Sequence, residues 1–129
     1  MNAKLIIESL SSKAKGILTD PDRLSSLIQK VKTKLEKDTH ISMDTVADDC
    51  KTGLNLLRAY AKNQYKDVPW KTLVSLVAAF VYFINPFDVI PDFIPIKGLI
   101  DDATVLLFVF SSVKLDLEKF KSNSKNTKG

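Results

Sequence analysis

The stretch from Tyr82 to Asp102, YFINPFDVIPDFIPIKGLIDD, decides the fold expected for this chain. Its 21 residues contain three prolines, four aspartates and one glycine among large apolar side chains. A solvated loop would be more polar, and a buried helix would not contain proline at this density. We therefore expect a stiff apolar connector that carries four carboxylates and lies between two hydrophobic helices.

Proline restricts the backbone of this connector. Two isoleucines each precede a proline, which disfavours the α region, so the segment is expected to run as successive turns. Turns leave backbone N–H groups that need acceptors when they are buried, and aspartate carboxylates supply such acceptors. In this structural interpretation Asp88 and Asp92 hold the proline turns. Asp101 caps the helix that follows, and Asp102 occupies its first turn.

The same four aspartates permit a second interpretation, a divalent-cation site. Oxygen ligands favour Mg²⁺, Ca²⁺ or Mn²⁺ over zinc, and the candidate ligands are Asp88, Asp92, Asp101 and Asp102. A carboxylate pair with a raised pKa could also act as acid and base. No nucleophile motif and no glycine-rich phosphate loop accompanies them. We therefore expect no catalytic residue and no cofactor, with Mg²⁺ or Ca²⁺ as the alternative.

The order of prolines and aspartates resembles the YkvA-like family, a bacterial domain family of unknown function. The pattern is Pro86-x-Asp88-x-Ile90-Pro91-Asp92-x-Ile94-Pro95, then Gly98 and Asp101-Asp102, with Tyr82 before it. The resemblance covers about residues 70–110. Asn85 and Lys97 depart from the family pattern, and Lys97 argues against a connector buried wholly in lipid. The resemblance implies a small helical domain, often membrane-associated, with no established activity.

Length and composition fit one globular domain. The chain has 129 residues, of which 45% are hydrophobic and 26% are charged. Its single cysteine, Cys50, excludes an intramolecular disulfide, and with one histidine, His40, a Cys/His zinc site is not expected. We predict Cys50 to be a core residue and His40 a loop residue. Residues 1–121 are expected to form the domain, and residues 122–129 a disordered polar tail.

Apolar residues at helical spacing predict helices over about 3–18, 21–37, 42–61, 69–84 and 101–120, and no strand. Asp20 is expected to cap the second helix, with Pro21 at its first position. The fourth helix is apolar on every face, so it lies either in the centre of a bundle or against lipid. We predict an all-α fold, a small bundle of four to five helices with a central apolar hairpin joined by the Pro/Asp-rich connector.

The net charge of +4 is distributed unevenly. Residues 1–72 carry 13 basic and 9 acidic groups, residues 73–113 carry one against four, and residues 114–129 carry five against two. Because 17 of the 19 basic residues are lysine, the charge suits solubility or a loose attraction to anionic lipid better than base-specific contacts. We expect no nucleic-acid partner.

The fourth helix is short for a membrane span. Trp70–Ile84 has 15 residues, or about 22 Å, whereas a span needs about 20 residues for roughly 30 Å of hydrocarbon. With no secretory signal, a cytosolic location is the default. The expected function is non-catalytic, a membrane-associated or protein-interaction module that meets the cytoplasmic membrane surface or a protein partner. A small integral membrane hairpin and a purely cytoplasmic domain are the alternatives, and no pattern indicates an oligomeric state.

The structural interpretation of the aspartates makes a direct prediction. Asp88→Ala or Asp101→Ala should lower the free energy of unfolding by about 1–2 kcal/mol, because each removes a cap or a buried hydrogen bond. Thermal melts of the two variants and the unchanged chain measure the effect. Melting curves that coincide with the parent curve would refute this role.

Overall fold

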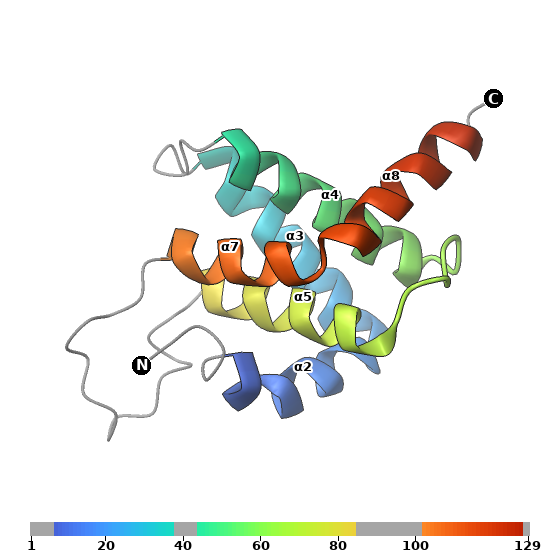
Figure 1. Ribbon diagram of the computed structural model, residues 1–129. Coiled ribbons are helices and arrows are strands. Elements are labelled where there is room, and N and C mark those ends of the chain that lie inside the picture. The colour runs from blue at the N-terminus through green and yellow to red at the C-terminus, as the bar shows by residue number, and fades with distance from the viewer. Residues whose placement is uncertain (1–6, 38–43, 85–101, 128–129) are drawn as a thin grey trace, which may run out of the picture.

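The computed structural model describes residues 7–37, 44–84 and 102–127, and these residues form helices with no strand among them (Figure 1). The helices are α2 (Ser11–Leu18), α3 (Pro21–Lys37), α4 (Asp44–Ala61), α5 (Trp70–Ile84), α7 (Asp102–Ser112) and α8 (Lys114–Thr127). The predicted all-α bundle is therefore confirmed.

Helix α5 lies in the middle of the bundle, packed against α2, α3 and α7 (Figure 1). Its residues from Thr72 to Phe83 are all buried except Ser75, which is half-buried. A helix that is apolar on every face needs apolar neighbours on every side, and the surrounding helices supply them. The sequence left two environments open for this helix, the centre of a bundle or lipid. Among the described residues, α5 lies in the centre of the bundle.

Helix α4 approaches this centre at Gly53, which is buried. A Cβ atom at Gly53 would lie 3.2 Å from Leu76 Cδ2, 3.5 Å from Phe80 Cζ and 3.6 Å from Phe110 Cε1. The Phe80 and Phe110 rings pack with their centroids 6.4 Å apart, and both are almost fully buried. The missing side chain of Gly53 therefore allows α4 to contact α5 and α7 at the same point.

The start of α3 follows the sequence prediction. Pro21 is its first residue, and Asp20 Oδ1 accepts hydrogen bonds from the N–H groups of Asp22 at 3.1 Å and Arg23 at 3.3 Å. Proline at this position loses no helical hydrogen bond, and the carboxylate satisfies two free amides. The predicted cap is confirmed.

Helices α5 and α7 run antiparallel, as the predicted hairpin requires. Phe80 of α5 packs on Phe110 of α7, and Thr72 Oγ1, nearer the start of α5, donates to Asp116 Oδ2 of α8 at 2.5 Å. Residues earlier in α5 therefore contact residues later in the C-terminal pair of helices. The single helix predicted over 101–120 is instead divided at Val113 into α7 and α8. Beside the break, Ser112 Oγ donates to Val109 O at 2.8 Å, a side-chain bond that competes with regular helix geometry.

The C-terminal helix differs from the prediction. Helix α8 runs to Thr127, whereas a disordered tail was expected from residue 122; no proline or glycine interrupts it before Gly129. Near the other end, residues 7–9 are helical and α2 begins at Ser11; the expected helix start near residue 3 lies outside the described residues. His40 and the expected start of α4 at residue 42 lie outside the described residues, and the domain boundary at 121 stays a prediction.

Gly53 offers a test of the packing. Gly53→Leu should lower the free energy of unfolding by about 1–3 kcal/mol, because its side chain would overlap Leu76, Phe80 and Phe110. Urea unfolding measures the change. Gly16→Ala in α2 is the control: its Cβ would meet only the mobile Arg23 guanidinium at 3.3 Å, so we expect a gain of up to about 1 kcal/mol. Equal stability of the two variants would contradict the close approach of α4.

Candidate functional site

Most of the site residues predicted from sequence lie in the segment 85–101, outside the described residues. These are Pro86, Asp88, Pro91, Asp92, Pro95, Gly98 and Asp101. Asp102 is the first residue of α7. Within the described part of the chain, no three His, Cys, Asp or Glu side chains lie close enough to hold a metal ion. The gathering of the four aspartates, with or without a divalent cation, therefore stays a prediction.

The structure does describe the end of α5 at which this segment begins. Lys34 Nζ of α3 donates to the carbonyl oxygen of Phe83 at 2.5 Å and lies 4.5 Å from the centroid of the Phe83 ring. A cation at a helix C-terminus is favourable for the helix dipole, and the ring face attracts it as well. This contact joins residues 49 positions apart, so no local sequence signal could have singled out Lys34.

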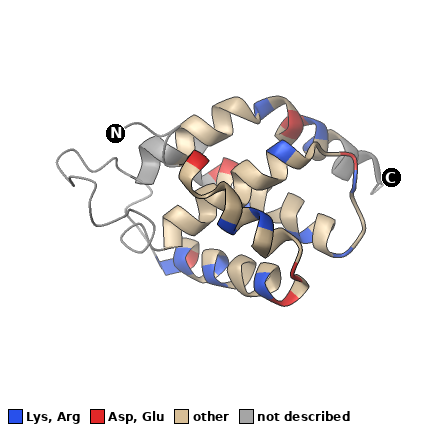
Figure 2. Cartoon of the chain, turned by 90° about the horizontal axis from the view of Figure 1, so that it is seen from below, with Lys and Arg blue, Asp and Glu red and all other residues tan. Residues whose placement is uncertain are grey.

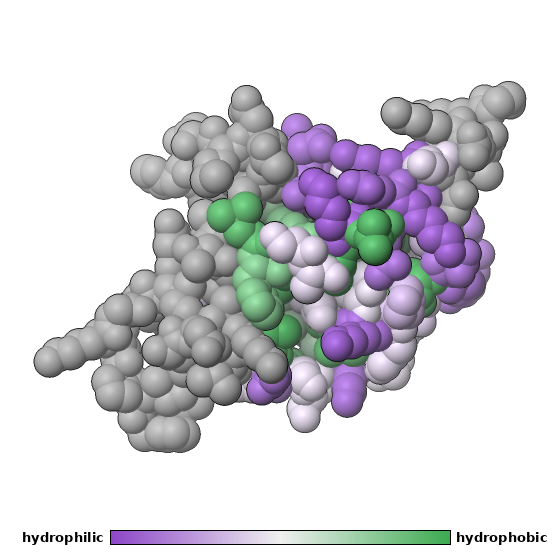
Figure 3. Space-filling view, viewed as in Figure 1, coloured by the Kyte–Doolittle hydropathy of each residue, from purple (hydrophilic) through white to green (hydrophobic). Residues whose placement is uncertain are grey.

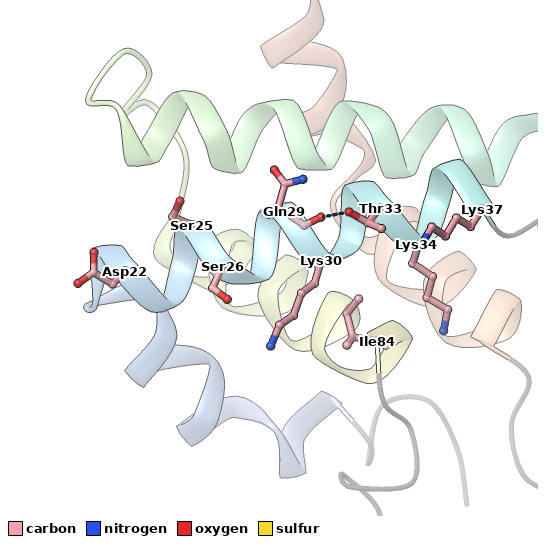
Figure 4. Close-up of a pocket in the computed structure, with 9 residues that line it drawn as sticks. All are labelled: Asp22, Ser25, Ser26, Gln29, Lys30, Thr33, Lys34, Lys37 and Ile84. Carbon is pink, nitrogen blue, oxygen red and sulfur yellow. Dashed lines mark hydrogen bonds between the residues drawn. The ribbon is translucent and has the colours of Figure 1, made fainter.

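An open groove follows the outer side of α3 to the end of α5, and we call it the α3 groove (Figure 4). Its volume is about 1130 Å³. Lys30 and Lys34 extend toward the end of α5 on either side of Ile84, and the Thr33 hydroxyl donates to the Gln29 carbonyl at 3.0 Å. The residues that line it are Asp22, Ser25, Ser26, Gln29, Lys30, Thr33, Lys34, Lys37 and Ile84.

The α3 groove is positively charged. It contains three lysines and one carboxylate, Asp22, which gives a net charge of +2. Asp22 lies eight residues before Lys30, or about 12 Å along the helix, which exceeds the screening length at physiological salt. Among the described residues no carboxylate forms an ion pair with Lys30 or Lys37. Their charges therefore face the solvent of the groove without a described counter-ion.

Lysines of α8 are in a different position. Lys119 Nζ lies 2.6 Å from Asp67 Oδ2, and Lys121 Nζ lies 2.9 Å from Asp48 Oδ2. The hydrogen bond and charge of Lys121 lower the pKa of Asp48, and the hydrogen bond to Asp67 raises the pKa of Lys119. These exposed pairs contribute little stability, but they partly neutralise the basic charge of the C-terminal helix.

A smaller groove of about 390 Å³ lies between α3 and α4, and we call it the α3–α4 groove. Its cations are Lys32, Lys51 and Arg58. Glu36 also lines it and stands four residues after Lys32, the spacing at which opposite charges on a helix attract. Its net charge of +2 equals that of the α3 groove, but its volume is smaller and its carboxylate lies within about one helical turn of a lysine.

Apolar side chains are exposed on the other side of the bundle. Leu107 and Phe108 of α7 are 36% and 40% exposed, and Leu115 of α8 is 81% exposed. We call these three residues the α7 face, and Figure 3, seen from the α7 side, shows separate green areas among paler and purple residues. Helix α7 contains no lysine or arginine. Figure 2 places α7 and the lysine-bearing α3 on opposite sides of the molecule, with α5 between them.

The comparisons with known proteins point to the segment around the connector. Residues 72–108 match the family described as "Protein of unknown function (DUF1232)". The chain is 37% identical over 70 residues to a Bacillus subtilis (strain 168) protein named "Uncharacterized membrane protein YkvA". That match covers 54% of this chain and 66% of the relative, slightly less than two thirds of its length. No solved structure matches the chain.

The fold and these matches define a small all-α domain of uncharacterised function. The family match and the relative named YkvA both support a YkvA-like, DUF1232 domain, so the resemblance seen in the prolines and aspartates is confirmed. The matched segment contains most of α5, the connector and the first half of α7. None of the helices in the described ranges combines the length and hydropathy needed to cross a bilayer.

Cys50 is a core residue, as predicted. Its side chain is fully buried in α4, and burial raises the pKa of its thiol to about 12. Because the thiolate is the reactive form, Cys50 should not react with a thiol reagent at about pH 8 in the folded protein and should react once urea unfolds it. Absorbance with an aromatic disulfide reagent measures both states. Rapid labelling without urea would contradict the burial.

Proposed function

We propose that this domain is a non-catalytic module that attaches to the cytoplasmic face of the membrane by binding its anionic surface. The observation that carries the proposal is the row of lysines on α3, two of which have no described ion pair. Basic groups near an anionic leaflet each contribute about 1 kcal/mol of attraction. Several such groups on one face bind reversibly without inserting into lipid.

The packing of α3 favours surface attachment over insertion of this helix. Its apolar stripe, Leu24, Leu27, Ile28 and Val31, is buried in the bundle. An amphipathic helix that inserts into a bilayer needs that stripe for the lipid. Only the polar and basic side of α3 is therefore free to meet a membrane, and its contribution is electrostatic.

The Bacillus subtilis relative is called a membrane protein, and this supports the same location for the present chain. A lysine-rich composition without base-reading arginines supports lipid over nucleic acid as the anionic partner. Surface attachment also requires no spanning helix. The connector, which belongs to the matched segment, begins at the end of α5, beside the α3 groove.

A protein partner is the second candidate, and the α7 face favours it. Leu107, Phe108 and Leu115 expose apolar area on one side of the bundle, without a cation on α7 beside them. Large apolar side chains exposed on the same side of a small domain favour a surface that another protein covers. The two candidates use different faces, so one domain could link a partner to the membrane.

Vesicle flotation tests the proposal. The protein should float with vesicles that contain anionic phospholipid at about 0.1 M salt and should be released at about 1 M salt, because salt screens exposed charges. Vesicles of neutral phospholipid are the control and should not carry the protein. The measured quantity is the fraction of protein in the lipid layer.

The other outcomes distinguish the alternatives. Flotation that resists about 1 M salt would contradict surface attachment and favour the integral hairpin. Absence from both kinds of vesicle would also contradict the proposal and favour a cytoplasmic module that binds a protein.

A further inference from the structure

We infer that the α3 groove is the surface that binds the phosphate groups of anionic phospholipids, with its lysine-rich end toward the bilayer. The inference rests on the proposed membrane attachment and names the residues that perform it. The lysine-rich end consists of Lys30, Lys34 and Lys37, and Ile84 lies between Lys30 and Lys34.

The donors of this groove fit phosphate groups at a surface. The three lysines stand at positions i, i+4 and i+7 of α3, so they share one side of the helix and span about 10 Å along it. That span lets the ammonium groups of Lys30 and Lys37 each meet an anion at a separate place along the helix, with the charge of Lys34 between them. Ser25, Ser26 and Gln29 add hydroxyl and amide groups along the same groove.

The apolar end of the groove places these charges toward the membrane. Ile84 lies between Lys30 and Lys34, and the Phe83 ring lies under the Lys34 ammonium group. Lysine stems commonly cover apolar surface of this kind while the ammonium group reaches an aqueous or interfacial anion. The groove is also open rather than enclosed, which suits a bilayer surface better than a small soluble ligand.

Other surfaces of the described chain are less suitable. In the α3–α4 groove Glu36 accompanies the cations, and Lys119 and Lys121 of α8 are paired with aspartates. Helix α7 has no lysine or arginine and lies opposite α3 (Figure 2). Because a flat bilayer cannot touch two opposite faces of one domain, attraction by anionic lipid selects the α3 side.

Two double variants with equal charge test the assignment. Lys30→Gln/Lys37→Gln removes two lysines from the α3 groove, and Lys32→Gln/Lys51→Gln removes two from the α3–α4 groove. Each lowers the net charge from +4 to +2. With vesicles of mixed anionic and neutral phospholipid, the first pair should weaken partitioning by about tenfold to thirtyfold and the second by less than about threefold.

A second variant and an internal reporter complete the design. Ser26→Glu adds a carboxylate to the groove without removing a lysine, and it should weaken partitioning by several fold. Trp70 is the sole tryptophan, is 44% exposed, and lies 14 residues, or about 21 Å, from Ile84 along α5. Its fluorescence emission should therefore stay at the same wavelength when vesicles bind. Thermal melts verify that every variant is folded.

The outcomes separate this inference from the proposed function. If the unchanged protein ignores anionic vesicles, surface attachment fails and the groove assignment fails with it. If the protein binds but the two double variants lose affinity equally, the groove assignment alone is overturned. A blue shift of Trp70 emission on binding would also overturn it, because the start of α5 would then contact lipid.

Discussion

The need to enclose α5 controls the rest of the structure. The residues of α5 after Lys71 carry no charged side chain, and a helix of this kind cannot face water on any side. Helices α2, α3 and α7 therefore surround it, and α4 reaches it at Gly53. Each neighbour contributes its apolar stripe to this contact. The outward side of α3 is left with its polar residues, and the lysine row of the α3 groove is thus a consequence of how the core is filled.

Polar contacts close the two ends of α5. Near its start Thr72 donates to Asp116 of α8, and near its end Lys34 donates to the carbonyl of Phe83. Both contacts join elements that are far apart in sequence, by 44 and 49 positions. The first contact fixes the start of α5 against α8, and the second fixes its end against α3. The Pro/Asp-rich connector follows that second contact in the sequence.

The sequence predicted those features that depend on local patterns. The Asp20 cap, the buried Cys50 and the all-round apolar character of α5 follow from residue type and spacing, and the structure has all three. The break at Val113 was missed, since the Ser112 hydroxyl favours it only weakly and the apolar pattern continues through it. The ion pairs of Lys119 and Lys121 on α8, and the lack of a described one at Lys30 and Lys37 on α3, depend on tertiary contacts, which no periodicity reveals.

Lys34 has two structural roles, one in the α3 groove and one at the end of α5. Its ammonium group lines the α3 groove and also anchors the last turn of α5 through Phe83. A charge scan along α3 would therefore misreport this position: a neutral side chain there would loosen the junction with the connector as well as remove a cation. Lys30 and Lys37 make no described contact with the end of α5. Variants at these two positions therefore report surface electrostatics without disturbing the bundle.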